Sequence, residues 1–343
     1  MNIEVADQKL TFKDFATDQE VRWCPGCGDY AILKAVQRTL ADVGAKTENT
    51  VFVSGIGCSS RFPHYMETYG FHTIHGRAPS FATGIKLANP DLDVWIITGD
   101  GDGFSIGGNH MLHILRRNLD TQILLFNNKI YGLTKGQYSP TSDVGTRSPS
   151  TPMGSIDEPL EPCATALGAG ARFVARSYDV AAKHLPEMLV RARDFNGTGF
   201  VEILQNCPVF NDGQFDELTN KKNVATLQLQ VEHGQPLLFG NDKELGLQVK
   251  PGSFELQVVT LGENGIAVDD ILVHDQHNKA LAQILIDMKG PEFPTAMGVF
   301  YCDPEATGYE TNVHAQLEAA REAKPGATLN ALMRQGRTWT IGS

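Results

Sequence analysis

The chain has 343 residues, of which 41% are hydrophobic and 20% charged, as expected for a globular protein with one large domain or two. Its formal net charge of −11 argues against nucleic-acid binding, which needs clustered Lys and Arg. The polar start, MNIEVADQKL, lacks the pattern of a signal peptide, and the apolar runs are far shorter than the ~20 residues of a membrane span. These features predict a cytoplasmic protein that binds neither nucleic acid nor membranes.

Strand-like and helix-like segments alternate after a polar arm over residues 1–22. Apolar residues at helical spacing predict a helix over residues 30–43, with Asp29 as its N-cap and Gly44 as its stop. Further helices are predicted near 106–117, over 160–169, and from a cap at Asp179 to about 194. The predicted strands are TVFVSG (50–55), DVWIITGDG (93–101), TQILLFNN (121–128), ARFVARS (171–177) and GFVEILQNC (199–207).

This alternation predicts an α/β fold, in which a parallel sheet is covered by helices on both faces. Ligands of such sheets bind beyond the carboxyl ends of the strands. From about residue 216 the pattern weakens to one clear strand (GSFELQVVTL) and helices near 278–288 and 313–323. We therefore divide the chain into a ligand-binding domain, residues 1–215, and a C-terminal extension, residues 216–343, that serves as a lid or a subunit contact.

Polar residues follow two of the predicted strands. Asp100 lies between two glycines at the end of one strand, and Asn128 ends the next. Both offer the oxygen ligands that Mg²⁺ prefers, and glycine N–H groups at a strand end can hold phosphate. A Gly-Asp-Gly sequence alone indicates only a tight turn. Its combination with Asn127-Asn128 after the following strand predicts a magnesium and diphosphate site.

The cysteines suggest a metal centre. Cys24 and Cys27 form a close pair on a Pro-Gly turn, and Cys58 and Cys207 each follow a predicted strand. Four thiolates suit either zinc or a [4Fe–4S] cluster, and one close pair with two distant cysteines favours iron–sulfur. The alternative for Cys58 and Cys207 is a buried, small apolar role. We assign that role to the remaining two cysteines, Cys163 in a predicted helix and Cys302 in a predicted strand.

Six motifs together resemble the β subunits of 2-oxoacid:ferredoxin oxidoreductases. In chain order they are WCPGCGD, SGIGCSS, HTIHGRAPSFATGIKLANP, GDGD, NNKIYGLTKGQYSPT and QNCPVFN, and they span roughly residues 22–215. The Gly-Asp-Gly and Asn-Asn pair resembles the signature of thiamine-diphosphate enzymes, so the resemblance implies a thiamine-diphosphate-binding fold of the diphosphate type.

The resemblance also implies roles for individual residues. A [4Fe–4S] cluster would be held by Cys24, Cys27, Cys58 and Cys207. Mg²⁺ would be held by Asp100, Asn128 and the carbonyl of Ile130. The diphosphate would be surrounded by Gly101, Asp102, Tyr131, Gly132, Leu133 and Thr134, and the thiamine would contact Ile56, Gly57, Cys58, Ser59 and His75.

The implied reaction is the coenzyme A-dependent oxidative decarboxylation of a 2-oxoacid, with electrons passing through the cluster to ferredoxin. The activating carboxylate of thiamine enzymes usually lies in a second, pyrimidine-binding domain, and the chain shows one diphosphate-type domain. The resemblance implies that a separate α subunit supplies the other, in an (αβ)2 heterotetramer.

Three further residues are candidates for catalysis or substrate binding. His75 can donate to an intermediate or phosphate oxygen, and its alternative is a hydrogen-bonded core histidine. Arg61 can grip a second substrate carboxylate, which favours 2-oxoglutarate, and its alternative is a surface arginine or a phosphate contact. Lys135 is a candidate for the substrate carboxylate or coenzyme A phosphate, or a solvated loop lysine.

Other functions remain open at this point. A pyruvate or broad-range 2-oxoacid oxidoreductase would carry the same motifs. A non-oxidative thiamine decarboxylase or ligase subunit would keep Asp100 and Asn128 but would not need four placed cysteines. A zinc-stabilised assembly module would need the cysteines but not the intact Asp100 and Asn128 pair.

Overall fold

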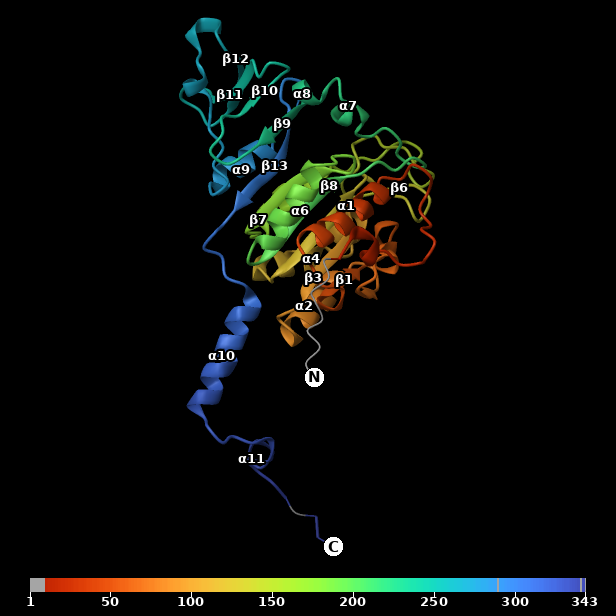
Figure 1. Ribbon diagram of the computed structural model, residues 1–343, viewed down its shortest axis with the longest axis vertical. Coiled ribbons are helices and arrows are strands. Elements are labelled where there is room, and N and C mark those ends of the chain that lie inside the picture. The colour runs from red at the N-terminus through yellow and green to blue at the C-terminus, as the bar shows by residue number, and fades with distance from the viewer. Residues whose placement is uncertain (1–9, 289, 340, 343) are drawn as a thin grey trace, which may run out of the picture.

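An eight-stranded sheet forms the centre of the computed structural model, which describes residues 10–288, 290–339 and 341–342 (Figure 1). Residues 1–9 of the predicted arm lie outside this range. The strand order is β2 (Tyr69–His72), β1 (Thr50–Ser54), β3 (Asp93–Gly99), β4 (Thr121–Asn127), β8 (Thr198–Leu204), β7 (Phe173–Tyr178), β13 (Thr295–Cys302) and β9 (Gln228–Val231). Neighbouring strands are parallel except β7 and β13, which are antiparallel. The predicted parallel sheet is therefore confirmed for six strands, and β13 and β9 at one edge run antiparallel to them.

Helices cover both faces of the sheet. One face packs against α2 (Ala78–Ala88), α4 (Gly108–Arg117), α5 (Pro162–Gly168) and α9 (Lys279–Ile286), and the other against α1 (Asp29–Asp42) and α6 (His184–Asp194). Strand residues alternate between the two hydrophobic clusters: Ile96 belongs to the first, and Trp95 and Ile97 to the second. This alternation is the reason why the strands are apolar on both sides and appear as continuous hydrophobic runs in the sequence.

Two predicted helix caps are wrong. Asp29 is the first residue of α1 and not its N-cap, which is Gly28. Asp179 lies five residues before α6, and its carboxylate accepts hydrogen bonds from the backbone N–H groups of Val180 and Asn206. Both carboxylates are buried near the cysteine loops, so tertiary contacts override their capping preference. Gly44, with φ +68°, follows α1 as predicted.

The segment after residue 215 contributes to the central sheet and to two outlying parts. The short helices α7 (Asp216–Thr219) and α8 (Val224–Leu227) lead into β9. A small antiparallel sheet of β10 (Leu238–Phe239), β11 (Leu245–Val249) and β12 (Leu256–Thr260) follows, and then α9 and β13. The sheet thus continues across the division that we placed at residue 215.

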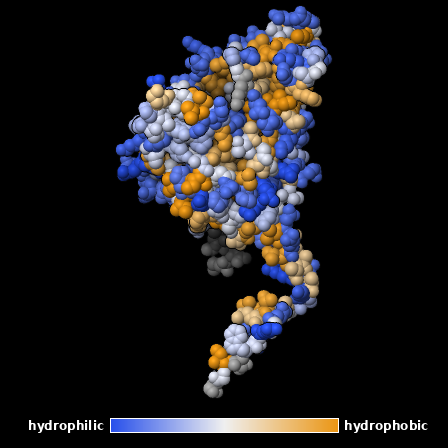
Figure 2. Space-filling view, turned by 180° about the vertical axis from the view of Figure 1, so that it is seen from behind, coloured by the Kyte–Doolittle hydropathy of each residue, from blue (hydrophilic) through white to orange (hydrophobic). Residues whose placement is uncertain are grey.

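The last part of the chain forms an arm. Figure 1 shows α10 (Tyr309–Ala323) and α11 (Leu329–Met333) extending away from the sheet, and Figure 2 shows apolar patches on this arm among hydrophilic ones. Leu329, Leu332 and Trp339 are among its exposed apolar residues. The role of residues 216–343 as a lid or subunit contact stays a prediction. In the part of the chain that the structure describes, none of the helices combines the length and apolar character that crossing a bilayer requires.

Candidate active site

A cavity opens at the carboxyl ends of β1, β3 and β4. Its position is the one expected for ligands of parallel sheets. The lining residues are Asp29, Ile56, Gly57, Cys58, Ser59, His75, Gly99, Asp100, Gly101, Asp102, Phe126, Asn128, Ile130, Tyr131, Gly132, Leu133 and Thr134. The fold therefore brings the thiamine, diphosphate and magnesium candidates of the sequence together around one cavity.

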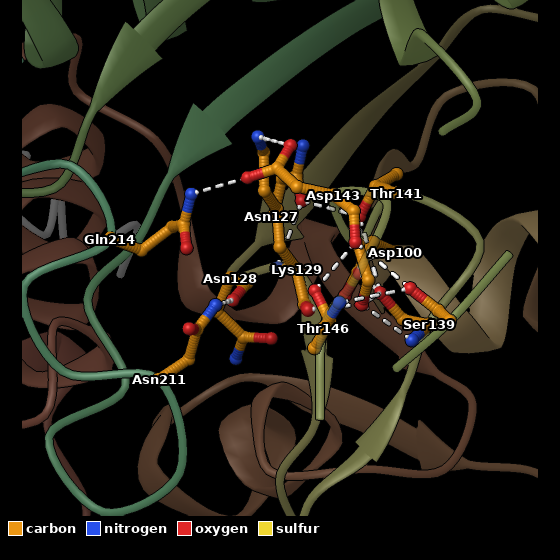
Figure 3. A network of polar contacts seen from close by, with 12 residues as sticks. Asp100, Asn127, Asn128, Lys129, Ser139, Thr141, Asp143, Thr146, Asn211 and Gln214 are labelled. Atoms are coloured by element: carbon orange, nitrogen blue, oxygen red, sulfur yellow. Dashed lines mark hydrogen bonds and ion pairs between the residues drawn. The ribbon is translucent and has the colours of Figure 1, made fainter. Parts of the chain in front are cut away.

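Asp100 begins the short helix α3 (Asp100–Phe104) and is 2% exposed. The hydroxyls of Ser139 and Thr141 donate to its Oδ2 at 2.5 and 2.6 Å (Figure 3). Burial raises the pKa of Asp100 to about 6, and these two hydrogen bonds oppose that rise. A cation beside the carboxylate would hold it in its charged form, so the site suits a divalent metal.

Asn128 is held from several sides. Its Nδ2 donates to Gln205 Oε1 at 2.8 Å, its Oδ1 accepts from the Ile130 N–H at 3.2 Å, and its carbonyl accepts from Asn211 Nδ2 at 2.9 Å. Lys129, between Asn128 and Ile130, has φ +55°, a left-handed conformation that turns the chain sharply. The turn allows both Asn128 and Ile130 to line the cavity.

The oxygens available here fit magnesium. A buried carboxylate, an amide oxygen and a backbone carbonyl of neighbouring residues form a hard, oxygen-only ligand set, and Mg²⁺ completes its octahedron with water and phosphate. Asn127, beside this set, links it to the interior. Its Oδ1 lies 3.0 Å from the Thr141 hydroxyl, and its Nδ2 donates to Glu202 at 2.7 Å.

Gly101 is required by packing against Tyr131. A Cβ at this position would lie 2.2 Å from the Tyr131 ring, and the Tyr131 hydroxyl donates to the Gly101 carbonyl at 3.0 Å. The sequence explained this glycine by close approach to phosphate alone. The structure adds that no side chain fits here even before a ligand binds.

Asp102 lines the cavity, but its carboxylate is occupied by protein donors. Oδ1 accepts from the backbone N–H groups of Ile56 and Gly76 at 3.1 and 2.8 Å, and Oδ2 accepts from the Thr98 hydroxyl at 2.8 Å. The nitrogen Nδ1 of His75 lies 2.5 Å from Oδ1 in a close but poorly aligned contact, an electrostatic contact and not a hydrogen bond. Asp102 therefore fixes the loops that carry Ile56 and His75.

The four candidate cluster cysteines come from three loops that meet beside the cavity. Cys24 and Cys27 lie on a turn closed by the Cys27 N–H, which donates to the Cys24 carbonyl at 3.0 Å. A Cβ built on Gly132 would lie 3.6 Å from the sulfurs of both Cys58 and Cys207. Cys27 lies near enough to Cys58 and Cys207, and Cys58 to Cys24, for the negative charge of one thiolate to raise the pKa of the other.

Burial and negative charge dominate the environment of these thiols, and the positive charge of Arg61 opposes their effect on the pKa of Cys58. Burial and the nearby Asp29 raise the pKa of Cys27 well above its ordinary value, and they raise the pKa of Cys58 to about 11. Asp29 is itself buried, which raises its pKa to about 7. A bound metal centre supplies the missing positive charge and favours the thiolate forms, so these residues fit one.

The sulfur spacing bears on which metal fits. In a tetrahedral zinc site with sulfurs at 2.3 Å from the metal, neighbouring sulfurs lie about 3.8 Å apart. Among the described residues, the groups of three or more ligating atoms that lie within 4.8 Å of one another do not include three of these sulfurs. The arrangement is wider than a single zinc ion requires.

Two candidates lie outside the cavity lining in the described chain. The Arg61 guanidinium donates to the carbonyl of Arg22, and Lys135 is exposed, with φ +76° and its N–H bonded to the Gly132 carbonyl. Cys163 is buried in α5, where its sulfur lies 3.2 Å from Glu202 Oε2, and Cys302 ends β13. These two cysteines lie in the predicted elements.

Sequence reasoning missed the residues that support the ligands. Ser139 and Thr141 lie in the motif NNKIYGLTKGQYSPT, and Gln205 opens QNCPVFN, but none of them was singled out. The sequence could have indicated these residues only by their position in motifs that also contain candidate metal ligands. Their partners, Asp100 and Asn128, lie 39, 41 and 77 residues away, so local spacing could not pair them.

Comparisons with known proteins agree with this geometry. Residues 55–203 match the family described as "Thiamine pyrophosphate enzyme, C-terminal TPP binding domain". The chain is 50% identical over 344 residues to the 2-oxoglutarate oxidoreductase subunit KorB of Mycobacterium tuberculosis, covering 99% of this chain and 91% of that protein. It is 48% identical over 190 residues to 2-oxoacid:ferredoxin oxidoreductase 1, subunit beta, of Aeropyrum pernix, covering 55% of this chain and 60% of that protein.

A solved structure is similar over nearly the whole chain. It is 2-oxoglutarate:ferredoxin oxidoreductase from Magnetococcus marinus with 2-oxoglutarate, coenzyme A and succinyl-CoA bound. The TM-score is 0.77 at 31% identity, and the match covers 96% of this chain and 97% of that chain. On the near-full-length relative and the thiamine-binding domain, this chain belongs to the β subunits of the 2-oxoacid:ferredoxin oxidoreductases.

Proposed function

We propose that this β subunit takes part in the oxidation of 2-oxoglutarate to succinyl-CoA and CO2, with electrons passing to ferredoxin. The observation that carries the proposal is the meeting of two ligand sets at one place. Cys58 lines the cavity that contains Asp100 and Asn128, and its sulfur faces Gly132 together with that of Cys207. The names of the Mycobacterium tuberculosis relative and the Magnetococcus marinus structure support 2-oxoglutarate as the substrate.

Asp100, Asn128 and the Ile130 carbonyl would hold Mg²⁺, which in turn binds the diphosphate of thiamine diphosphate. The main chain at Gly101 and from Tyr131 to Thr134 borders the same cavity and can donate N–H groups to phosphate oxygens. When bound, thiamine diphosphate supplies an electron sink for decarboxylation, and an iron–sulfur cluster accepts electrons one at a time. His75 lies beside Asp102 at the cavity wall, where its ring would present an N–H group as a hydrogen-bond donor or hold a proton.

Cys24, Cys27, Cys58 and Cys207 would hold a [4Fe–4S] cluster. The wide sulfur spacing and the separate loops support a multinuclear cluster, whose sulfurs bind different irons, over a single zinc ion. The intact Asp100 environment disfavours a zinc-stabilised assembly module, and the four placed thiols disfavour a non-oxidative decarboxylase.

The chain would act with an α subunit, as in an (αβ)2 heterotetramer. The carboxylates in the cavity lining are Asp29, Asp100 and Asp102, and no glutamate lines the described cavity. Asp100 and Asp102 already bind hydroxyl and backbone donors, and Asp29 lies beside Cys27. A partner that supplies the activating carboxylate for the aminopyrimidine is therefore part of the proposal.

The test is anaerobic co-purification with the α subunit and a substrate panel with coenzyme A and ferredoxin. We expect ferredoxin reduction to require coenzyme A and to be fastest with 2-oxoglutarate, and we expect no turnover by the isolated β subunit. Equal or faster turnover of pyruvate would replace 2-oxoglutarate by a broad or pyruvate-type specificity. CO2 release without ferredoxin reduction would refute the oxidoreductase assignment for this chain.

A further inference from the structure

Gln205 touches both candidate cofactor sites through a single side chain. Its Oε1 accepts a hydrogen bond from Asn128 Nδ2 at 2.8 Å, and its Nε2 donates to the sulfur of Cys27 at 3.3 Å. Nε2 also donates to the carbonyl of Asn206. One amide therefore connects a candidate magnesium ligand with a candidate cluster ligand.

The partners of this amide determine which way it faces. A backbone carbonyl and a thiolate only accept hydrogen bonds, so the Gln205 nitrogen faces Asn206 and Cys27. The Gln205 oxygen then faces Asn128, which must present its own nitrogen. The oxygen of Asn128 then lies on the other side of its amide, where it accepts from the Ile130 N–H and retains a second lone pair for a metal ion.

The side chain has little freedom to leave this position. Gln205 is 1% exposed, and its N–H donates to the Asn127 carbonyl at 2.9 Å, directly after β8 and β4 end. A Cβ at Gly28 would lie 2.0 Å from Asp179 Oδ2 and 2.9 Å from Gln205 Cγ. The absence of a side chain at Gly28, next to Cys27, thus leaves room for both the Asp179 carboxylate and Gln205.

We propose that Gln205 is a positioning residue shared by the two sites, which orients Asn128 for Mg²⁺ and donates an N–H to the Cys27 thiolate of the cluster. The inference rests on the proposed function, because it needs both groups to bind. Mutation of a residue that hydrogen-bonds to a metal ligand commonly lowers metal affinity by about 10- to 100-fold. Hydrogen bonds to cluster sulfurs make the reduction potential less negative, because they stabilise the more electron-rich reduced state.

Gln205→Met tests both contacts, because methionine keeps the length of the side chain and removes its donor and acceptor. In the complex with the α subunit, we expect the Mg²⁺ concentration needed to bind thiamine diphosphate to rise at least tenfold. We also expect the midpoint potential of the cluster ligated by Cys27 to become more negative. A redox titration monitored by EPR measures this potential. A tenfold loss of preference for the reduced state corresponds to about 59 mV for one electron.

Gln205→Glu separates the two contacts. Its ionised carboxylate still accepts from Asn128, so the Mg²⁺ requirement should stay closer to that of the wild type than it does in Gln205→Met. It cannot donate to sulfur and adds negative charge, so the cluster potential should fall. Gln283→Met is the control, because Gln283 lies in α9 and donates to Asp287, away from both sites.

The outcomes distinguish this inference from the proposed function. Wild-type complex without iron or without Mg²⁺-dependent thiamine diphosphate binding would refute the proposed function itself. Wild-type complex with both groups, and Gln205→Met with unchanged Mg²⁺ requirement or unchanged potential, would refute the shared role of Gln205. Equal effects in Gln283→Met would mean that the changes do not depend on the position of Gln205, and would overturn the inference as well.

Discussion

Thr141→Val is the most direct test of the magnesium site, because it removes one hydroxyl and keeps the shape of the side chain. The hydroxyl donates to Asp100 Oδ2 at 2.6 Å and lies 3.0 Å from Asn127 Oδ1. A hydrogen bond to a charged group contributes about 1.5–3 kcal/mol. Its loss should weaken Mg²⁺ binding roughly 10- to 100-fold, as expected when a partner of a metal ligand is removed.

The same change should alter the pH dependence of binding. Burial raises the pKa of Asp100 to about 6, and the Thr141 bond holds it down, so the variant should need a higher pH for Mg²⁺ to displace the proton. The assay is Mg²⁺-dependent thiamine diphosphate binding to the αβ complex by calorimetry between pH 6 and 8. Thr165→Val, which loses a hydroxyl bonded to the Glu161 carbonyl in α5, is the control. Wild-type Mg²⁺ affinity in Thr141→Val, at every pH, would refute the magnesium site at Asp100.

Three further predictions test the cluster, the substrate and the acid stability. Anaerobically purified protein should contain about four iron atoms per chain, and serine in place of Cys24, Cys27, Cys58 or Cys207 should reduce this number. Serine in place of Cys163 or Cys302 should leave it unchanged. Stoichiometric zinc instead of iron would contradict the prediction. If Arg61 turns from the Arg22 carbonyl to a substrate carboxylate in the complex, Arg61→Met should lower kcat/KM for 2-oxoglutarate roughly 10- to 150-fold. The loss of kcat/KM for pyruvate should be much smaller. Equal losses for the two substrates would show that Arg61 does not bind the substrate. Burial lowers the pKa of His184 from 6.5 to about 4, so its contribution to stability is complete above pH 6.5 and is lost as the pH falls toward 4. Denaturant unfolding should show this loss, up to about 3 kcal/mol, in the wild type and not in His184→Asn. Identical pH profiles for the two proteins would refute this prediction.

The main elements could be predicted because their signals are local. Buried strands in a sheet covered on both faces appear as short β-branched runs, and β1, β3, β4, β7 and β8 lie where those runs are. The rule that ligands bind at the carboxyl ends of parallel strands then placed Asp100 and Asn128 at one edge. Topology, and not residue spacing, brought the predicted cavity residues together.

The failures concern contacts between distant segments. Asp29 begins α1 and Asp179 precedes α6, but both are buried around the cysteine loops, where Asp179 binds the Asn206 N–H. The four-residue strand β9 gave no clear pattern, because it is recognised only by pairing with β13, more than 60 residues later. The direction of the Arg61 side chain depends on the carbonyl of Arg22, 39 residues earlier. Such choices depend on tertiary context that a single sequence does not display.

The pairing of β4 with β8 explains why the two ligand sets meet where they do. Asn127 pairs with Leu204 at the end of the parallel ladder, so the next residues, Asn128 and Gln205, emerge side by side. Gln205 then bonds to Asn128, and Cys207 follows two residues later and faces Gly132. On the other side of the same edge, β1 and β3 are neighbours that deliver Cys58 and Asp100. A sheet of this strand order therefore carries the candidate oxygen ligands on its middle strands and the candidate sulfur ligands on the strands beside them. This order would place the proposed site of decarboxylation next to the proposed site of electron removal.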